Sequence, residues 1–270
     1  MVIDAHLHLW DTSRHRYDWL LRPGNESINR TFAFEDFAGR ALTAGVDSAV
    51  LVQADDDAAD TEAMFEVADA HDEIAGVVGW VPLDRPGEAE AALDRLRARP
   101  KFAGIRNLTH DQPDPDWLLR PEVGESLALL ERYDVPFDVI AVLPRHLEHV
   151  PVLSERYPRL RMVLDHLGHP PLGGDDWEPW RTLITKAAAN PLVHAKLSGL
   201  YPVSEARPFV EFALELFGSG RLMFGSDWPV AELGGGYQPV ADALLEVIGD
   251  VPVPQRYAVL AGTASAFYSL

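Results

Sequence analysis

The stretch VIDAHLHLWD (residues 2–11) decides the fold. It begins with an apolar run typical of a buried parallel strand. No GxGxxG turn follows it, although a dinucleotide-binding sheet would place that turn there. Seven further β-rich runs follow along the chain, at residues 47–53, 74–81, 102–106, 136–142, 161–166, 193–197 and 221–227.

Longer stretches with helical spacing of apolar residues separate these runs. Helices are predicted at 34–45, 60–71, 86–98, 124–133, 145–157, 178–189 and 207–218, with closing helices at 238–248 and 254–270. Pro151 weakens the fifth of these predictions. Eight alternations predict an α/β fold, a (β/α)8 TIM barrel in a single domain over residues 1–270. A doubly wound open sheet is the alternative, which the count of eight and the missing glycine-rich turn disfavour. Residues 12–30 are expected to form a long loop over the barrel mouth.

Composition limits the classes of function. The 270 residues carry a net charge of −19 and no cysteine. The acidity argues against a nucleic-acid partner, and the lack of cysteine excludes disulfides, thiolate nucleophiles and zinc–thiolate sites. No apolar run approaches the length of a membrane span, and no signal peptide is recognisable. We therefore expect a cytoplasmic protein that acts on a small molecule, with a homo-oligomer left open.

The C-terminal ends of barrel strands form the active site in this fold. The predicted strands end in the following residues: His6 and His8, Gln53, Trp80, Arg106, Asp165 and His166, Lys196, and Asp227 with Trp228. The strand at 136–142 ends with nothing polar.

His6 and His8 lie two residues apart, so strand alternation points both rings the same way, with Asp4 deeper on the same side. If that direction is inward, two imidazole nitrogens converge at the barrel mouth, where they suit a metal ion or an oxyanion. Local packing of each histidine is the competing interpretation, and the position in the barrel favours function.

Asp227 follows the eighth strand, opposite the first, and is placed to act as a general base on water or as a metal ligand. A helix N-cap is the alternative, which Pro229 and the glycines at 234–236 weaken. His166 has the alternative of a core histidine paired with Asp165. Arg106 and Lys196 are predicted to bind a carboxylate or polarise a carbonyl, with a buried ion pair between strands as the alternative.

Seven motifs occur in one order along the chain: VIDAHLHLWD, LVQA, GVVGWVPLD, GIRN, VLDHLGHP, KLSGL and RLMFGSDWPV. Together they resemble the amidohydrolase superfamily, and within it the subgroup of sugar-lactone and 2-pyrone-4,6-dicarboxylate lactonases. The resemblance runs from Val2 to Tyr268. It implies hydrolysis of a cyclic ester, a sugar-acid lactone such as fucono-, rhamnono- or galactonolactone, in sugar-acid catabolism.

The resemblance also implies roles for single residues. It points to His6, His8, His166 and Asp227 as the catalytic group, and to Arg106 as a substrate-binding residue. Trp80 and Trp228 are expected to line the pocket against the C–H face of a sugar, with core packing as the alternative. Gln53 and Lys196 complete the predicted substrate-binding set.

Four positions depart from the motifs of the family. They are Asn107 for a histidine, His169 for a lysine, Thr263 for an asparagine and Ala195 for a cysteine. These departures bear on the substrate more than on the reaction.

The metal content has two alternatives. The resemblance implies that a binuclear centre would need a bridging lysine on the fourth strand and histidines on the fifth and sixth. This chain has Arg106 on the fourth strand and no histidine after the fifth, so a binuclear centre is not expected. The chain is expected to use either no cofactor or one divalent metal, zinc, held by His6, His8 and Asp227. A mononuclear zinc amidohydrolase or decarboxylase for a small acidic substrate is the alternative enzyme, and a non-catalytic sugar-acid-binding barrel is the alternative from another class.

Overall fold

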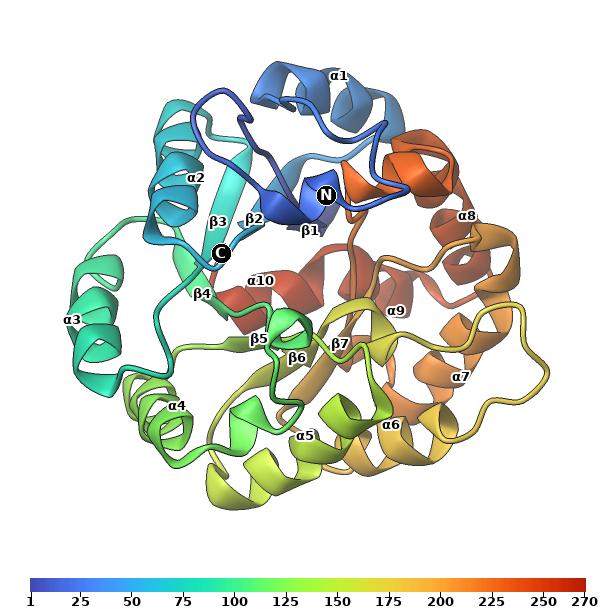
Figure 1. Cartoon of the computed structure of the whole chain (residues 1–270). Coiled ribbons are helices and arrows are strands. Elements are labelled where there is room, and N and C mark those ends of the chain that lie inside the picture. Colours follow the sequence, from blue (N-terminus) through green and yellow to red (C-terminus); the bar gives the residue numbers. More distant parts are fainter.

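Eight parallel strands pair in chain order and are ringed by helices, as the computed structural model of residues 1–270 shows (Figure 1). The strands are β1 (Ile3–Leu7), β2 (Ser48–Val52), β3 (Ile74–Gly79), β4 (Phe102–Arg106), β5 (Phe137–Val139), β6 (Met162–Leu164), β7 (Val193–Leu197) and β8 (Leu222–Phe224). The helices that follow them are α1 (Phe34–Ala44), α2 (Ala58–Ala70), α3 (Pro86–Leu96), α4 (Pro121–Tyr133), α5 (Pro144–Arg156), α6 (Trp180–Ala188), α7 (Arg207–Phe217) and α8 (Tyr237–Gly249). The (β/α)8 barrel predicted from the sequence is confirmed.

Three strands of the second half are much shorter than the sequence predicted, whereas β7 has the predicted bounds. β5, β6 and β8 contain three residues each. The polar residues at the ends of the predicted runs 161–166 and 221–227 therefore lie in turns beyond the strands. The helix over the fifth predicted stretch continues through Pro151 as α5.

The barrel closes between β1 and the segment after β8. The backbone N–H of Asp227 donates to the carbonyl of His6 at 2.8 Å, and the N–H of His8 donates to the carbonyl of Trp228 at 2.8 Å. Closure therefore brings the first and last polar strand ends into direct contact.

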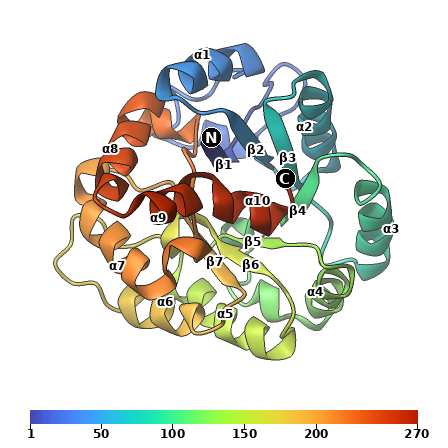
Figure 2. The same ribbon diagram turned by 180° about the vertical axis from the view of Figure 1, so that it is seen from behind.

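The interior of the barrel is filled by a small apolar cluster. Ile3, Ala5, Val50 and Met223 belong to it, together with side chains of the C-terminal helix α10 (Thr263–Tyr268). The view from behind shows α9 (Val253–Tyr257) and α10 across that end of the barrel (Figure 2). The C-terminal segment thus covers the end of the barrel opposite the C-terminal ends of the strands, and the interior is a packed core and not a pore.

A β-bulge in β1 changes the expected direction of one side chain. The pairing with β2 shifts between Asp4, opposite Ala49, and Leu7, opposite Leu51. Asp4 accepts a hydrogen bond from the Tyr237 hydroxyl of α8 at 3.0 Å, so it faces the outer helices. The prediction that Asp4 points the same way as the two histidines is wrong, because the bulge adds one residue to the alternation.

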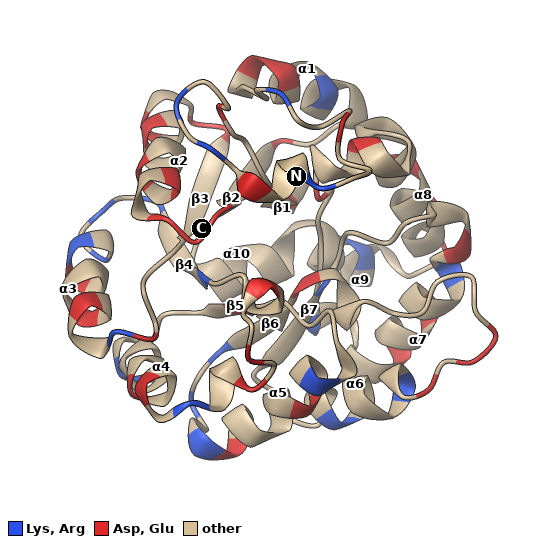
Figure 3. Ribbon diagram, viewed as in Figure 1, with Lys and Arg blue, Asp and Glu red and all other residues tan.

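The outer helices carry interspersed acidic and basic side chains (Figure 3). None of the helices is long and apolar enough to cross a membrane.

Candidate active site

A cavity of about 340 Å³ lies over the C-terminal ends of the strands, beneath the loop at 12–31. Its wall is part apolar and part polar, as in most small-molecule sites. It is lined by His8, Trp19, Arg22, Ala54, Arg106, Leu108, His110, Asp111, Ile140, Val142, His166, His169, Gly199, Tyr201, Asp227 and Val230. The predicted loop over the barrel mouth is thus present and contributes Trp19 and Arg22, at and just after a short 3₁₀ helix (Asp18–Leu21).

Two tight turns carry His166 and Asp227 into this cavity. Each residue has left-handed backbone dihedrals, with φ of 54° at His166 and 57° at Asp227. Left-handed backbone is uncommon for residues other than glycine, and it is enriched at functional sites. The turns direct the two side chains back toward β1, whereas continued strands would carry them past the rim.

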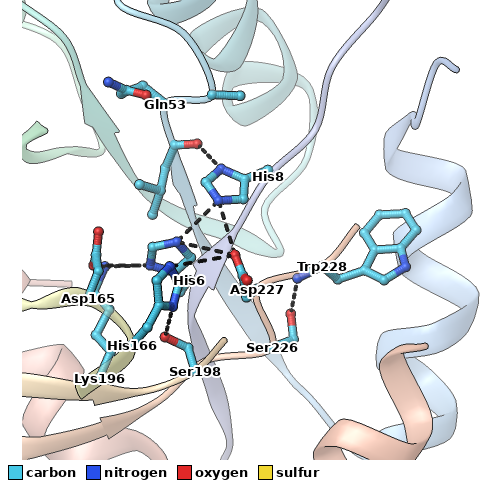
Figure 4. A network of polar contacts seen from close by, with 12 residues as sticks. His6, His8, Gln53, Asp165, His166, Lys196, Ser198, Ser226, Asp227 and Trp228 are labelled. Carbon is cyan, nitrogen blue, oxygen red and sulfur yellow. Dashed lines mark hydrogen bonds and ion pairs between the residues drawn. The ribbon is translucent and has the colours of Figure 1, made fainter. Parts of the chain in front are cut away.

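The carboxylate of Asp227 meets three imidazoles (Figure 4). Its Oδ1 lies 3.7 Å from His6 Nε2, 3.5 Å from His8 Nε2 and 3.9 Å from His166 Nε2. The Nε2 atoms of His6 and His8 are 3.1 Å apart. The convergence expected from the first-strand motif is therefore present, and His6, His8, His166 and Asp227 form one cluster.

His166 packs against the segment that follows β7. Its Nδ1 lies 2.9 Å from Ser198 Oγ. Gly199 has φ of +60°, and a Cβ there would stand 2.4 Å from His166 Nδ1. Only glycine leaves room for the imidazole in this position. His166 is therefore not the core histidine paired with Asp165 that the sequence offered as an alternative.

A buried ionic layer lies directly beneath the cluster. Asp165 contacts His6 Nδ1 at 3.2 Å, Arg106 at 3.2 Å and Lys196 Nζ at 3.1 Å. Lys196 Nζ also reaches Asp138 Oδ2 at 2.5 Å and His6 Nδ1 at 3.0 Å. The layer thus contains two cations, Arg106 and Lys196, and two carboxylates, Asp138 and Asp165, and its charges balance. His6 lies between this layer and the cavity.

This environment keeps two of the cluster imidazoles, those of His6 and His166, neutral at pH 7. Burial lowers the pKa of His6 well below its ordinary value, and the positive charge of Lys196 lowers it further. Burial likewise lowers the pKa of His166. For Asp227, burial raises the pKa, but His166, His8 and His6 outweigh burial and hold the pKa below its ordinary value. Asp227 is therefore an ionised proton acceptor at neutral pH.

The buried carboxylates beneath the cluster differ in pKa. Burial raises the pKa of Asp138 to about 6, against the attraction of Lys196. Burial also raises the pKa of Asp165, but Lys196, His6 and Arg106 together reverse the shift and hold it well below the ordinary range. Both carboxylates are ionised at pH 7, which is consistent with the paired charges of the layer.

The donor atoms fit one divalent metal ion. His6 Nε2, His8 Nε2 and Asp227 Oδ1 are separated pairwise by 3.1, 3.5 and 3.7 Å. Tetrahedral zinc with bonds of about 2.0–2.2 Å separates its ligands by about 3.3–3.6 Å. Two nitrogens and one oxygen also match the ligand types that zinc takes when a fourth position stays open.

A sequence profile of the amidohydrolase family matches residues 3–270, nearly the whole chain. This chain belongs to the amidohydrolase family. It is a hydrolase.

Similar amidohydrolases are known. The chain is 36% identical over 240 residues to an L-fucono-1,5-lactonase of Burkholderia ambifaria, a match that covers 86% of this chain and 82% of the relative. It is 30% identical over 288 residues to an L-fucono-1,5-lactonase of Burkholderia multivorans, covering 99% of this chain and 96% of the relative. A crystal structure of an amidohydrolase from Burkholderia multivorans with bound zinc superposes with a TM-score of 0.91 at 30% identity, covering 100% of this chain and 99% of the other.

Four residues of this amidohydrolase that were predicted to bind substrate do not line the cavity. Lys196 and Gln53 are fully buried beneath it, and Gln53 donates to Asp56 at 2.9 Å. Trp228 is also fully buried and points away from the histidines, with its indole N–H donating to Glu232 at 2.6 Å (Figure 4). Trp80 does not line the cavity either. The structure thus places these four residues outside the cavity wall and Arg106 in it, and the substrate-binding roles stay predictions.

Several cavity residues were not predicted. Tyr201 lies with its hydroxyl 3.0 Å from the Ser226 carbonyl and 3.5 Å from Asp227 Oδ2. Arg22 and His110 reach the cavity from irregular segments, which strand-end reading does not cover, whereas Trp19 belongs to the loop that was expected over the barrel mouth. Tyr201 carried a usable signal, because it follows the predicted strand 193–197 by only a few residues.

Of the four departures from the family motifs, one reaches the cavity. His169 lines it, with its ring centroid 5.2 Å from that of His166 and its Nδ1 3.2 Å from the Ala141 carbonyl. Asn107 instead donates to the Val81 carbonyl at 3.0 Å, and Thr263 bonds to the Ser219 carbonyl near the opposite end of the barrel.

Proposed function

We propose that this amidohydrolase opens a sugar-acid lactone, a cyclic ester, to the free hydroxy acid. The observation that carries the proposal is one ionised carboxylate, Asp227, within 3.9 Å of three imidazoles at the wall of a cavity of monosaccharide scale. The lactonase activity named for relatives at 36% and 30% identity supports the choice of a lactone.

In this proposal Asp227 moves the proton. Its carboxylate takes a proton from water while the water oxygen bonds to the lactone carbonyl carbon. The bond from that carbon to the ring oxygen then breaks, and Asp227 returns the proton to the departing alkoxide. The product is a ring-opened hydroxy acid, and Asp227 is again a carboxylate.

The negative charge that develops on the carbonyl oxygen needs a fixed donor. Arg106 lines the cavity and is held by Asp165 at 3.2 Å, with its other terminal nitrogen bonded to the Gln53 carbonyl. A preorganised donor of this kind typically lowers the activation free energy of the reaction by about 2.7–4 kcal/mol. A zinc ion held by His6, His8 and Asp227 would add Lewis-acid polarisation of the carbonyl when bound.

The charges of the cavity favour a neutral substrate over an acidic one. Both arginines of the wall are already paired, Arg106 with Asp165 and Arg22 with Asp111 at 2.8 Å. A dicarboxylate substrate would need cations that are not committed to carboxylates of the protein. This argues against the alternative of a zinc amidohydrolase or decarboxylase for a small acidic substrate.

A lactone panel tests the proposal. Chelator-treated and zinc-supplemented protein is assayed in a pH-indicator assay with fucono-, rhamnono- and galactonolactones, and with 2-pyrone-4,6-dicarboxylate as the acidic comparison. We expect kcat/KM above about 10³ M⁻¹s⁻¹ for at least one neutral lactone, since typical enzymes exceed about 10⁴. Hydrolysis of the dicarboxylate alone would show that the substrate is an acidic lactone and would contradict the choice of a neutral one. No hydrolysis of any lactone, with or without zinc, would refute the proposal.

A further inference from the structure

His8 has a fixed tautomer. Its Nδ1 lies 2.7 Å from the carbonyl oxygen of Val52, which only accepts hydrogen bonds. Nδ1 of the neutral ring therefore carries the hydrogen. The Nε2 of His8 is left with a lone pair directed at the cluster.

That lone pair faces His6. The two Nε2 atoms are 3.1 Å apart, a hydrogen-bond distance at which two lone pairs repel. Without a metal ion, the repulsion is relieved when His6 carries its hydrogen on Nε2 and donates it to His8. The Nδ1 of His6 must then accept a hydrogen bond, and Lys196 Nζ, a pure donor, lies 3.0 Å from it.

The opposite tautomer of His6 has a partner in the same place. Asp165 Oδ1 lies 3.2 Å from His6 Nδ1 and has no hydrogen-bond partner of its own, while it lies within ion-pair distance of Lys196. With the hydrogen on Nδ1 and donated to Asp165, His6 Nε2 is free to coordinate a metal ion. Metal-bound histidines almost always donate the other ring N–H to a carboxylate, a backbone carbonyl or water.

We propose that Lys196 is a positioning residue that holds His6 in the Nε2–H tautomer and thereby weakens divalent-metal binding at His6, His8 and Asp227. The ammonium group is fully buried and fixed between Asp138 at 2.5 Å and Asp165 at 3.1 Å. Arg106 is also a pure donor, and its N–H lies 3.3 Å from His6 Nε2, so it acts together with Asp165 toward the opposite tautomer. Lys196 and Asp165 thus act on one ring nitrogen in opposite directions, the first against metal and the second for it.

Zinc affinity is the direct test, and it does not depend on which substrate is hydrolysed. Chelator-stripped full-length protein is titrated with Zn²⁺ in competition with a chromogenic chelator. The variant Lys196→Met combined with Asp138→Asn removes a cation and an anion together. We expect it to bind Zn²⁺ about 10- to 100-fold more tightly than the wild type, the range typical of outer-shell partners of metal ligands.

Three comparisons complete the titration. Asp138→Asn alone keeps the ammonium group and is expected to bind Zn²⁺ no more tightly than the wild type. Lys186→Met on the exposed face of α6 is the matched control and is expected to leave the affinity unchanged. Asp165→Asn is expected to weaken binding about 10-fold or more, because it removes the carboxylate acceptor of the metal-binding tautomer. Equal affinities in the wild type and the double variant would overturn the proposal.

Imidazole ¹⁵N NMR of the metal-free wild-type protein tests the tautomer itself. This measurement does not depend on whether the double variant folds. The His6 signals are assigned with a His6→Gln variant. We expect a protonated Nε2 that gives way to a protonated Nδ1 when Zn²⁺ is added. A protonated Nδ1 in the metal-free wild type would refute the tautomer mechanism, even if the double variant bound zinc more tightly through charge alone.

Discussion

Asp227 and His6 share a backbone hydrogen bond of 2.8 Å, N–H to carbonyl, at the seam where the barrel closes. Gly225 makes that seam possible, because a Cβ there would stand 2.7 Å from the Cβ of His6. The carboxylate and the imidazole thus come together through the same contact that closes the sheet. The cluster of His6, His8, His166 and Asp227 therefore forms through the same contacts that close the barrel.

The first prediction concerns proton transfer at Asp227. Asp227→Asn keeps the backbone bond to His6 but removes the proton acceptor. We expect kcat on the best lactone to fall by at least 10²-fold, the lower end of general acid–base contributions. Circular dichroism and the thermal midpoint should stay near those of the wild type. Asp72→Asn, at an exposed position, is the control for loss of one charge. Near-normal turnover of Asp227→Asn would exclude the carboxylate as the proton carrier.

The second prediction concerns the space that Gly199 leaves for His166. Gly199→Ala places a Cβ 2.4 Å from the ring in a backbone conformation of φ +60°. His166 must move away from Asp227, so we expect kcat/KM to fall about 10-fold or more. Gly87→Ala in α3 meets nothing within 4 Å and should leave activity unchanged while raising stability by about 0.4–1 kcal/mol. Full activity in Gly199→Ala would show that the position of His166 does not matter.

The fold and the central cluster followed from the sequence because both depend on short-range patterns. Eight apolar runs define the barrel, and barrel geometry then places their ends at one rim. His6, Arg106 and Asp227 were found in this way. Asp4 was misplaced because a bulge in β1 leaves no mark in the pattern of apolar residues.

Residues that act through long-range contacts were harder to assign. Lys196 was expected at the rim, yet it lies beneath the cavity because Asp138 and Asp165 compensate its charge there. Asp138 itself was overlooked, since it lies inside β5 where an apolar side chain is expected. Arg22 and His110 reach the cavity from irregular segments, whose course depends on packing that no periodicity encodes.

The third prediction concerns the stability of the ion pair between Lys196 and Asp138. Lys196→Met leaves two buried carboxylates with one cation fewer, and we expect the free energy of unfolding to fall by about 3–5 kcal/mol. Asp138→Asn should cost a similar amount. The double variant should cost clearly less than the sum, because both unpaired charges are gone. Urea unfolding of the four proteins gives the coupling energy, and simple additivity would mean that the two groups do not interact.

The last prediction uses pH. Asp56 is partly buried, accepts hydrogen bonds from the Leu108 N–H at 2.8 Å and from Gln53 at 2.9 Å, and burial raises its pKa from 3.8 to about 6. The folded chain then binds this proton more tightly than the unfolded chain. The contribution of Asp56 to the free energy of unfolding should therefore fall as pH rises from about 4 to about 6, and stay at the lower level above that range.

Asp56→Asn removes this titration but retains an acceptor oxygen. We expect the stability of the variant relative to the wild type to rise by about 1–2 kcal/mol between pH 4.5 and 7.5, a value reduced for the partial exposure of the group. Urea unfolding at the two pH values measures it, and all other titrating groups cancel in the difference. Asp72→Asn, with an exposed carboxylate, should show a flat difference. A difference for Asp56→Asn that is flat or falls with pH would mean that the folded chain does not favour the protonated carboxyl.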